Sequence, residues 1–152
     1  MLKRFATGLI LAVMACAPSG CAPAPSSGKG FTLPDGNVDE GQVAFVSLKC
    51  HACHTVSGVE VAEIDAEMDT RVELGGKVTR VSTYGELVTS IINPSHKLAS
   101  GYMEDVVATD SESKMTVYND VLTVQQLIDL VAFLQSRYEL KPYEPTTYPP
   151  YY

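Results

Sequence analysis

The sequence of 152 residues has no tryptophan and is short of basic residues. Only 11 Lys and Arg stand against 18 Asp and Glu, which gives a formal net charge of −7. Binding to a nucleic-acid backbone needs clustered Lys and Arg, so this balance argues against nucleic acid as a partner. Charged residues make up 19% and hydrophobic residues 45%, a composition too apolar for a wholly disordered chain. The length suggests one domain of ordinary size with tails.

The N-terminal apolar run is too short to cross a bilayer as a helix. It covers the eleven residues 5–15 behind Lys3 and Arg4, whereas a spanning helix needs about 20 residues. A basic start followed by a short apolar stretch is typical of a secretory signal. We therefore predict that residues 1–15 are a signal peptide and that the mature chain lies outside the cytoplasm.

Two cysteines stand close to the end of this run. The residues before Cys16 resemble a bacterial lipoprotein signal, in which the cysteine is lipidated and becomes the first mature residue. Cys21, behind two small residues, is the alternative lipidation site. Ordinary cleavage after Ala15 or Ala17 would instead leave a soluble periplasmic protein. We expect a periplasmic protein that is held at a membrane by a lipid on Cys16.

Proline and glycine divide the rest of the chain. Residues 18–36 hold four Pro, four Gly and three Ser, which predicts a flexible linker over residues 16–36. Residues 141–152 hold four Pro and four Tyr, which predicts an extended tail. One folded domain is expected between them, over residues 37–140.

The two cysteines inside this domain stand in the motif Cys50-His51-Ala52-Cys53-His54. Cys-x-x-Cys-His is the attachment pattern of c-type haem. On a helical turn, positions i, i+3 and i+4 project to one side, so two sulfurs and an imidazole can face one macrocycle. Cys50 and Cys53 would bond covalently to the haem and His54 would bind its iron, whereas His51 is expected at the surface.

Other uses of this motif fit less well. A redox-active Cys-x-x-Cys usually follows a strand within a βαβ unit, but a helical pattern precedes Cys50. A zinc site would need two further ligands, and after His54 only His96 remains, with no further cysteine. A disulfide across two intervening residues would be strained and would close a very small loop.

Most of the segment from 38 to 138 resembles the class I, single-haem cytochrome c family. Gly41 and Phe45 stand in the family's recurrent Gly-x-x-x-Phe arrangement, and residues 122–134 resemble its C-terminal helix. The resemblance implies a mostly α-helical bundle of about three to four helices around one covalently attached haem c. It also implies that Gly41 meets Phe133 where the first and last helices cross.

Local patterns predict two of these helices without the resemblance. Apolar residues recur at i, i+3, i+4 and i+7 within residues 127–134, which indicates an amphipathic helix with Thr123 or Asp120 as its N-cap. Thr83 with Glu86 forms a capping-box pattern at the start of a short second helix.

Three segments of the domain allow two interpretations each. Residues 72–78 contain Gly-Gly and form either a small β-hairpin or a loop along the haem edge. Residues 100–114 form either a two-stranded excursion or a partner-recognition element. The six acids of residues 60–73 are typical of a solvated face; the alternative is steering toward a positively charged redox partner.

The second axial position of the iron decides whether such a protein passes electrons or binds a ligand. The resemblance places the ligand methionine shortly before the C-terminal helix, where Met115 stands, with Thr116 in place of the common Pro. His96 and Met103 are the rival ligands. A Met115 that simply fills a gap in the core is the remaining alternative.

The surroundings of the ligands are less defined. Tyr102 and Tyr118 are candidates for a hydrogen bond to a haem propionate. Many relatives use a Pro carbonyl to orient the ligand histidine. No Pro occurs between His54 and Pro94, so no specific partner is predicted for the His54 ring.

We expect an electron carrier and not an enzyme. One haem, bound by His54 and Met115, would cycle between Fe(III) and Fe(II), with redox proteins as donor and acceptor and without a small-molecule substrate. Haem burial and a thioether ligand both favour the reduced state. The alternative is a haem-bearing electron-transfer subunit of a larger membrane-associated oxidoreductase complex.

Overall fold

The computed structural model describes residues 27–61 and 71–142. The predicted signal peptide, Cys16 and Cys21 lie outside the described residues, as do the tail beyond residue 142 and the middle of the acidic segment with Met68. Within the described part, no helix is both long and apolar enough to cross a membrane. The compact unit begins at Phe31.

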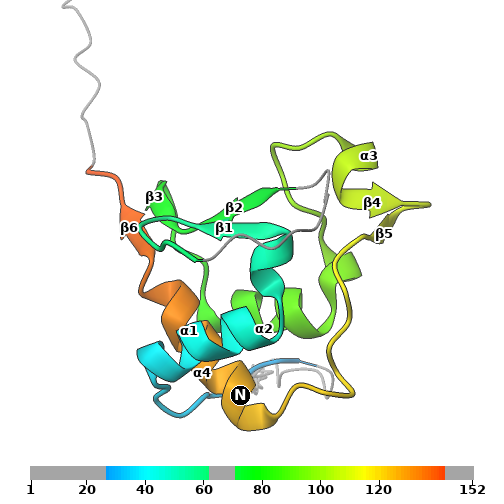
Figure 1. Ribbon diagram of the computed structural model, residues 1–152. Helices are drawn as coiled ribbons and strands as arrows, with labels where there is room; N and C mark the ends of the chain where they lie inside the picture. The colour runs from blue at the N-terminus through cyan, green and yellow to red at the C-terminus, as the bar shows by residue number, and fades with distance from the viewer. Residues whose placement is uncertain (1–26, 62–70, 143–152) are drawn as a thin grey trace, which may run out of the picture. The chain divides into compact units, whose positions relative to one another are not determined.

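The first and last helices, α1 (Val38–Ser47) and α4 (Val124–Gln135), lie against each other in the compact unit (Figure 1). A Cβ atom on Gly41 would overlap the Asp129 carbonyl oxygen and would lie 2.6 Å from the Phe133 Cβ atom. The predicted meeting of Gly41 and Phe133 is therefore confirmed, and it depends on the missing side chain.

Both α1 and α4 start at a side chain that accepts backbone hydrogen bonds. Asn37 caps α1, because its Oδ1 accepts from the Asp39 and Glu40 amides. Thr123 caps α4 in a capping box with Gln126, so Thr123 and not Asp120 is the N-cap.

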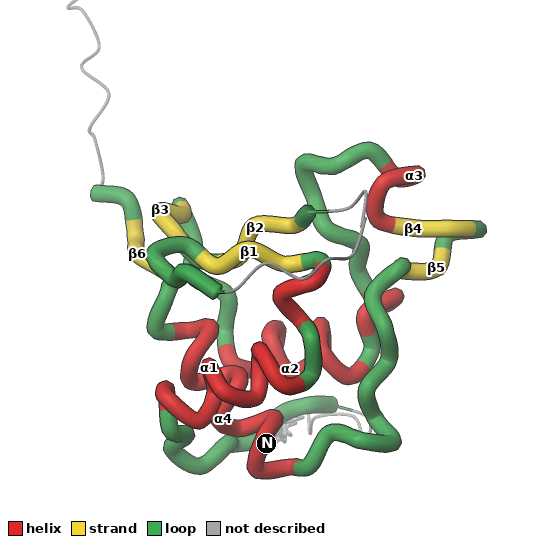
Figure 2. Tube along the Cα trace, viewed as in Figure 1, coloured by secondary structure: helices red, strands yellow, loops and turns green. Residues whose placement is uncertain are grey.

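The third helix of the core, α2 (Tyr84–Ile92), begins at the predicted capping box of Thr83 and Glu86. It ends at Asn93, and Pro94 opens the short 3-10 helix η2 (Pro94–His96). Figure 2 shows α1, α2 and α4 gathered at one end of the unit and the strands β1, β2, β3 and β6 at the other.

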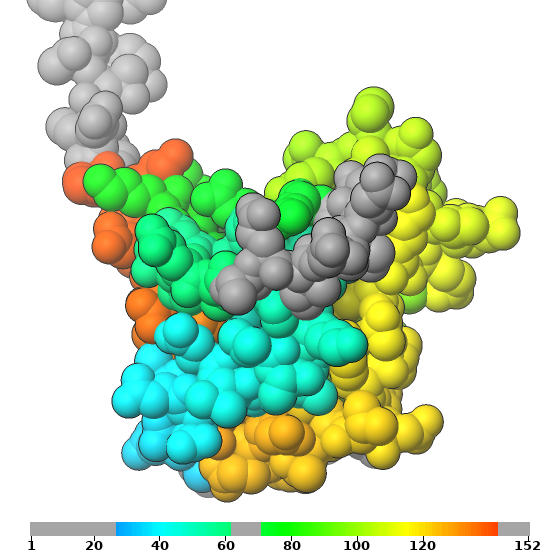
Figure 3. All heavy atoms as spheres, in the orientation of Figure 1, coloured from blue at the N-terminus to red at the C-terminus, as the bar shows by residue number. Residues whose placement is uncertain are grey.

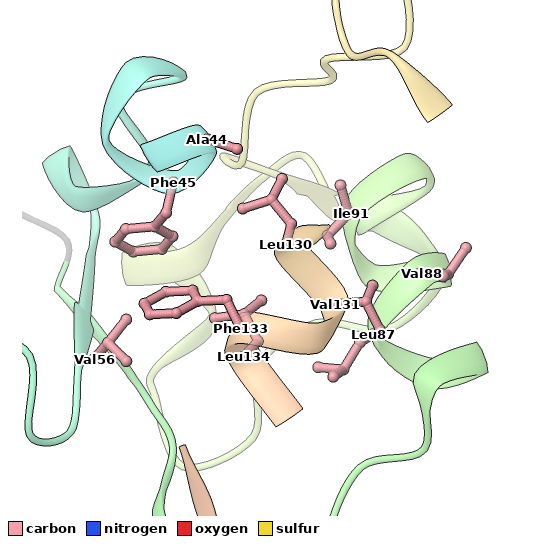
Figure 4. Packing of buried hydrophobic residues seen from close by; sticks show 10 residues of the cluster. All are labelled: Ala44, Phe45, Val56, Leu87, Val88, Ile91, Leu130, Val131, Phe133 and Leu134. Carbon is pink, nitrogen blue, oxygen red and sulfur yellow. The ribbon is translucent and has the colours of Figure 1, made fainter. Parts of the chain in front are cut away.

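The core lies between these three helices. The rings of Phe45 and Phe133 face each other at its centre, with centroids 5.7 Å apart and planes at 52° (Figure 4). Leu130 extends the contact from α4 toward Ile91 of α2 (Figure 4). The predicted mostly α-helical bundle is confirmed.

Two short parallel sheets replace the hairpin considered for residues 72–78. Strand β1 (His54–Val56) pairs with β2 (Val72–Leu74), and β3 (Gly76–Val78) pairs with β6 (Tyr138–Leu140). The hairpin interpretation is wrong, because Gly75 alone separates β2 from β3 and a tight hairpin needs two turn residues. Gly75, with φ of 84°, directs the chain from one pairing partner to the other.

The small hairpin of this fold lies in the 100–114 segment instead. It follows the short helix α3 (Glu104–Val107), and its strands are β4 (Ala108–Thr109) and β5 (Glu112–Ser113). Asp110 and Ser111 have φ of 51° and 65°, and positive φ at both turn residues is the requirement of a type I′ turn. Residues 100–114 therefore contain the two-stranded excursion.

Residues 31–36, which the sequence places in the linker, lie against the domain; we call them the strap. The Tyr84 hydroxyl donates to the Phe31 carbonyl oxygen at 2.7 Å. Leu33 packs on the core, and a Cβ atom on Gly36 would lie 2.6 Å from the carbonyl oxygen of Ile128 on α4. The strap thus passes over α4 and reaches the start of α2.

Candidate functional site

The Cys-x-x-Cys-His motif begins where α1 ends. Lys49 adopts a left-handed conformation, with φ of 58°, and reverses the chain into the 3-10 helix η1 (Cys50–Ala52). His54 already belongs to strand β1. The motif is therefore a 3-10 turn followed by a strand, and not the single helical turn that its spacing suggested. Cys50 and Cys53 are free, half-buried thiols and form no disulfide.

A cavity opens beside this motif. The space between its lining residues, counted together with its open mouth, is about 610 Å³. Its lining is almost wholly apolar and comes from all three core helices, from β2 and from the loop before α4. The lining residues are Phe45, Leu48, Cys50, His54, Leu74, Leu87, Ser90, Ile91, Met115, Tyr118, Leu122, Leu130 and Leu134.

The His54 ring is oriented by the backbone of β2. Its Nδ1 lies 3.3 Å from the carbonyl oxygen of Val72. Burial lowers the pKa of His54, and the hydrogen bond to Val72 opposes that shift. A ring that donates through Nδ1 leaves Nε2 free to bind a metal ion. No sequence signal identified Val72, because the parallel pairing of β1 with β2 creates this contact.

Burial also affects the first cysteine of the motif. It raises the pKa of the Cys50 thiol to about 11, and the nearby Cys53 adds to the effect. At neutral pH the free thiol is therefore protonated and uncharged, as suits a side chain that lines an apolar cavity.

Met115 is placed differently from its two described rivals. It is half-buried and lines the cavity. His96 is exposed, outside the lining, with its Nδ1 2.7 Å from the Asn93 carbonyl oxygen. Met103 is 71% exposed and is also absent from the lining. Among the described candidates for the sixth ligand, Met115 alone shares a cavity with His54.

The two candidate tyrosines also separate. Tyr118 lines the cavity, and burial raises the pKa of its hydroxyl. Tyr102 lies outside the lining, and its hydroxyl accepts a hydrogen bond from the Glu73 amide at 3.0 Å. Ser90 is a lining residue that sequence reasoning missed, although its spacing from Leu87 on α2 places both on one helix face.

His51 is buried, so its expected place at the surface is wrong. Its side chain is only 9% exposed and lies against Phe45, with ring centroids 6.4 Å apart. The reversal at Lys49 brings η1, which contains His51, back against α1. Nδ1 of His51 has no hydrogen-bond partner among the described residues.

The arrangement fits a covalently bound haem better than a zinc ion. No group of three or more His, Cys, Asp or Glu side chains in residues 27–61 and 71–142 could hold a metal ion. The cavity instead brings together a thiol, an imidazole and a thioether within an apolar lining. Cys50 and Cys53 could form the thioethers to such a group. His54 of β1 and Met115 of the loop before α4 could bind its iron.

Comparison with known proteins identifies the family. The family model described as cytochrome c matches residues 38–137, that is, 100 of 152 residues. No curated protein and no solved structure is a significant match to the chain. The fold and the matched segment together show that this chain belongs to the cytochrome c family, whose members bind haem c covalently and carry electrons.

Proposed function

We propose that this chain is a class I, monohaem electron carrier in which Cys50 and Cys53 hold the haem and His54 and Met115 bind its iron. The observation that carries the proposal is that His54 and Met115 line the same apolar cavity. The motif supplies one set of two thiols and one imidazole, which is enough for one haem. When bound, the haem supplies a one-electron change between Fe(III) and Fe(II).

The side chains around the cavity would tune that change. The Val72 carbonyl holds the His54 ring in one orientation and increases its basicity as a ligand. Leucine side chains of α2 and α4 exclude water from the iron, and a dry site with a thioether ligand favours the reduced state. We therefore expect a relatively high reduction potential.

Substitution of Met115 tests the ligand assignment. Met115→Ala should abolish the red-region methionine-to-iron charge-transfer band of the oxidised protein and should open the iron to carbon monoxide in the reduced protein. The expected reason is loss of the thioether that occupies the sixth position. Absorption spectra and carbon monoxide binding rates of the purified holoprotein provide the measurement.

Two matched variants serve as controls for this test. Met103→Ala removes an exposed methionine, and His96→Ala removes the exposed histidine. Both should keep the band at full intensity. A band that survives in Met115→Ala, or that disappears in either control, would contradict Met115 as the ligand.

We also propose that the carrier works outside the cytoplasm, anchored by a lipid on Cys16, with Cys21 as the alternative site. The short apolar run behind Lys3 and Arg4 supports this location. Its donor and acceptor would be redox proteins.

A further inference from the structure

The loop that carries Met115 has no helix or strand of its own. It covers residues 114–123, between β5 and the N-terminal end of α4. Figure 3 shows this yellow segment as a continuous strip along one side of the unit. No Pro occurs between Pro94 and Pro142, so nothing in the backbone itself stiffens the loop. Its conformation depends on contacts with its neighbours.

One end of the loop is bound to η2. The Ser113 amide donates to the Ser95 hydroxyl at 3.0 Å, and the Ser113 hydroxyl accepts from the Met115 amide at 3.2 Å. Ser95 follows Pro94, which is buried at the end of α2. The backbone of Met115 is thus connected through two serines to η2, which follows directly after the helix that forms one wall of the cavity.

The other end of the loop is bound to the same place. Nδ2 of Asn119 donates to the carbonyl oxygen of Ile92 at 2.9 Å, and Ile92 is the last residue of α2. Its neighbour Ile91 lines the cavity. Both ends of the segment from Ser113 to Asn119 therefore attach to the short stretch from Ile92 to Ser95.

We propose that Ser95 and Asn119 are positioning residues that hold Met115 over the cavity by fixing its loop to the end of α2. This inference rests on the proposed role of Met115 as iron ligand. Neither residue lines the cavity, so each acts through the loop backbone. The two attachments restrict the conformations of a segment that would otherwise lift the thioether away.

The loss of one attachment should make loop opening more frequent. A single net hydrogen bond corresponds to a change of about 2- to 13-fold in the opening equilibrium. Carbon monoxide can bind the reduced iron only when the thioether has left, so its binding rate reports the open fraction. Ser95→Ala and Asn119→Asp should each raise this rate by about 2- to 13-fold and lower the midpoint potential.

The experiment uses the full-length holoprotein and measures carbon monoxide binding, midpoint potential and the charge-transfer band. Ser95→Thr keeps the hydroxyl and should restore wild-type values. Ser47→Ala is the matched control, because it removes a similar hydrogen bond, from the Ser47 hydroxyl to the Ala44 carbonyl oxygen, on α1. It should leave the rate and the potential unchanged.

The outcomes separate this inference from the proposed function. If Met115→Ala loses the band while Ser95→Ala and Asn119→Asp bind carbon monoxide at the wild-type rate, Met115 is the ligand and the positioning role is wrong. An equal rise in Ser47→Ala would also overturn it, since general destabilisation would then explain the effect. If Met115→Ala keeps the band, the ligand assignment fails. Should Ser95→Ala fail to fold, Asn119→Asp decides.

Discussion

Gly41 and Asp129 set the closest approach of the first and last helices. The Asp129 carbonyl oxygen occupies the space where a Gly41 side chain would lie. The Asp129 carboxylate is 5% exposed and accepts from the Asn37 amide at 2.8 Å and from Nε2 of Gln125 at 3.0 Å. Asp129 therefore binds the start of α1 through its carboxylate, and its backbone carbonyl sets how closely α1 and α4 can approach.

Gly41→Ala should destabilise the protein by about 1–3 kcal/mol, because the added methyl group must separate α1 from α4. Denaturant unfolding of the holoprotein measures the effect. Gly85→Ala is the control, since a Cβ atom there meets nothing closer than Thr83 Oγ1 at 3.9 Å. The free energy of unfolding of Gly85→Ala should be equal to that of the wild type or up to about 1 kcal/mol higher. Equal effects of both substitutions would contradict the close packing at Gly41.

At the scale of elements, the first turn of α2 concentrates polar contacts on one side chain. The Glu86 carboxylate accepts a hydrogen bond from the Thr83 backbone amide at 2.8 Å. It also accepts one from each terminal nitrogen of the Arg80 guanidinium, at 2.7 and 2.9 Å. The Arg80 guanidinium, followed by the Thr83 amide, lowers the pKa of Glu86 to about 2. The same carboxylate thus caps the helix and forms a bidentate ion pair.

This depressed pKa predicts a pH dependence. A carboxyl group whose pKa is lower in the folded than in the unfolded state stabilises the fold above its ordinary pKa of 4.5, and this contribution disappears as the pH falls toward about 2. Glu86→Gln keeps the capping box but loses the charge. Its urea midpoint should therefore decline less steeply between pH 4.5 and pH 2 than that of the wild type.

Arg80→Gln provides the cross-check for this prediction. It should flatten the same pH profile, and the double variant should behave like Glu86→Gln alone, because the two side chains form one interaction. Parallel profiles for the wild type and Glu86→Gln would show that the ion pair does not control acid stability.

At the scale of the whole molecule, the proposed lipid anchor predicts where the protein is found. Cys16→Ser should move the haem absorbance from the membrane fraction to the soluble periplasmic fraction, because the variant cannot carry the lipid. Each buried CH₂ of an acyl chain contributes about 0.8 kcal/mol to membrane binding, so loss of the acyl chains removes the anchor. Cys21→Ser should stay in the membrane fraction. Release by Cys21→Ser instead would assign the anchor to Cys21, and a soluble wild type would refute the lipoprotein proposal.

Much of the helical structure was predictable because its signals are local. The caps Thr83 and Thr123 and the apolar stripe of α4 lie within one or two turns of the residues they organise. The place of Met115 was predicted from a family resemblance and agrees with its position in the cavity wall. The burial of His51 was not predictable, because it depends on the left-handed turn at Lys49.

By itself, the sequence determined the haem-attachment motif and the helices that begin at Thr83 and Thr123, since short spacings and helix periodicity specify them. The first helix and the contact of Gly41 with Phe133 were expected from the family resemblance. Only the tertiary structure decided the hydrogen-bond partner of His54, the pairing of β2 and β3 with different strands, and the attachment of the Met115 loop to α2. The physical reason is that these contacts join residues far apart in the chain, where backbone direction and not residue type selects the partner.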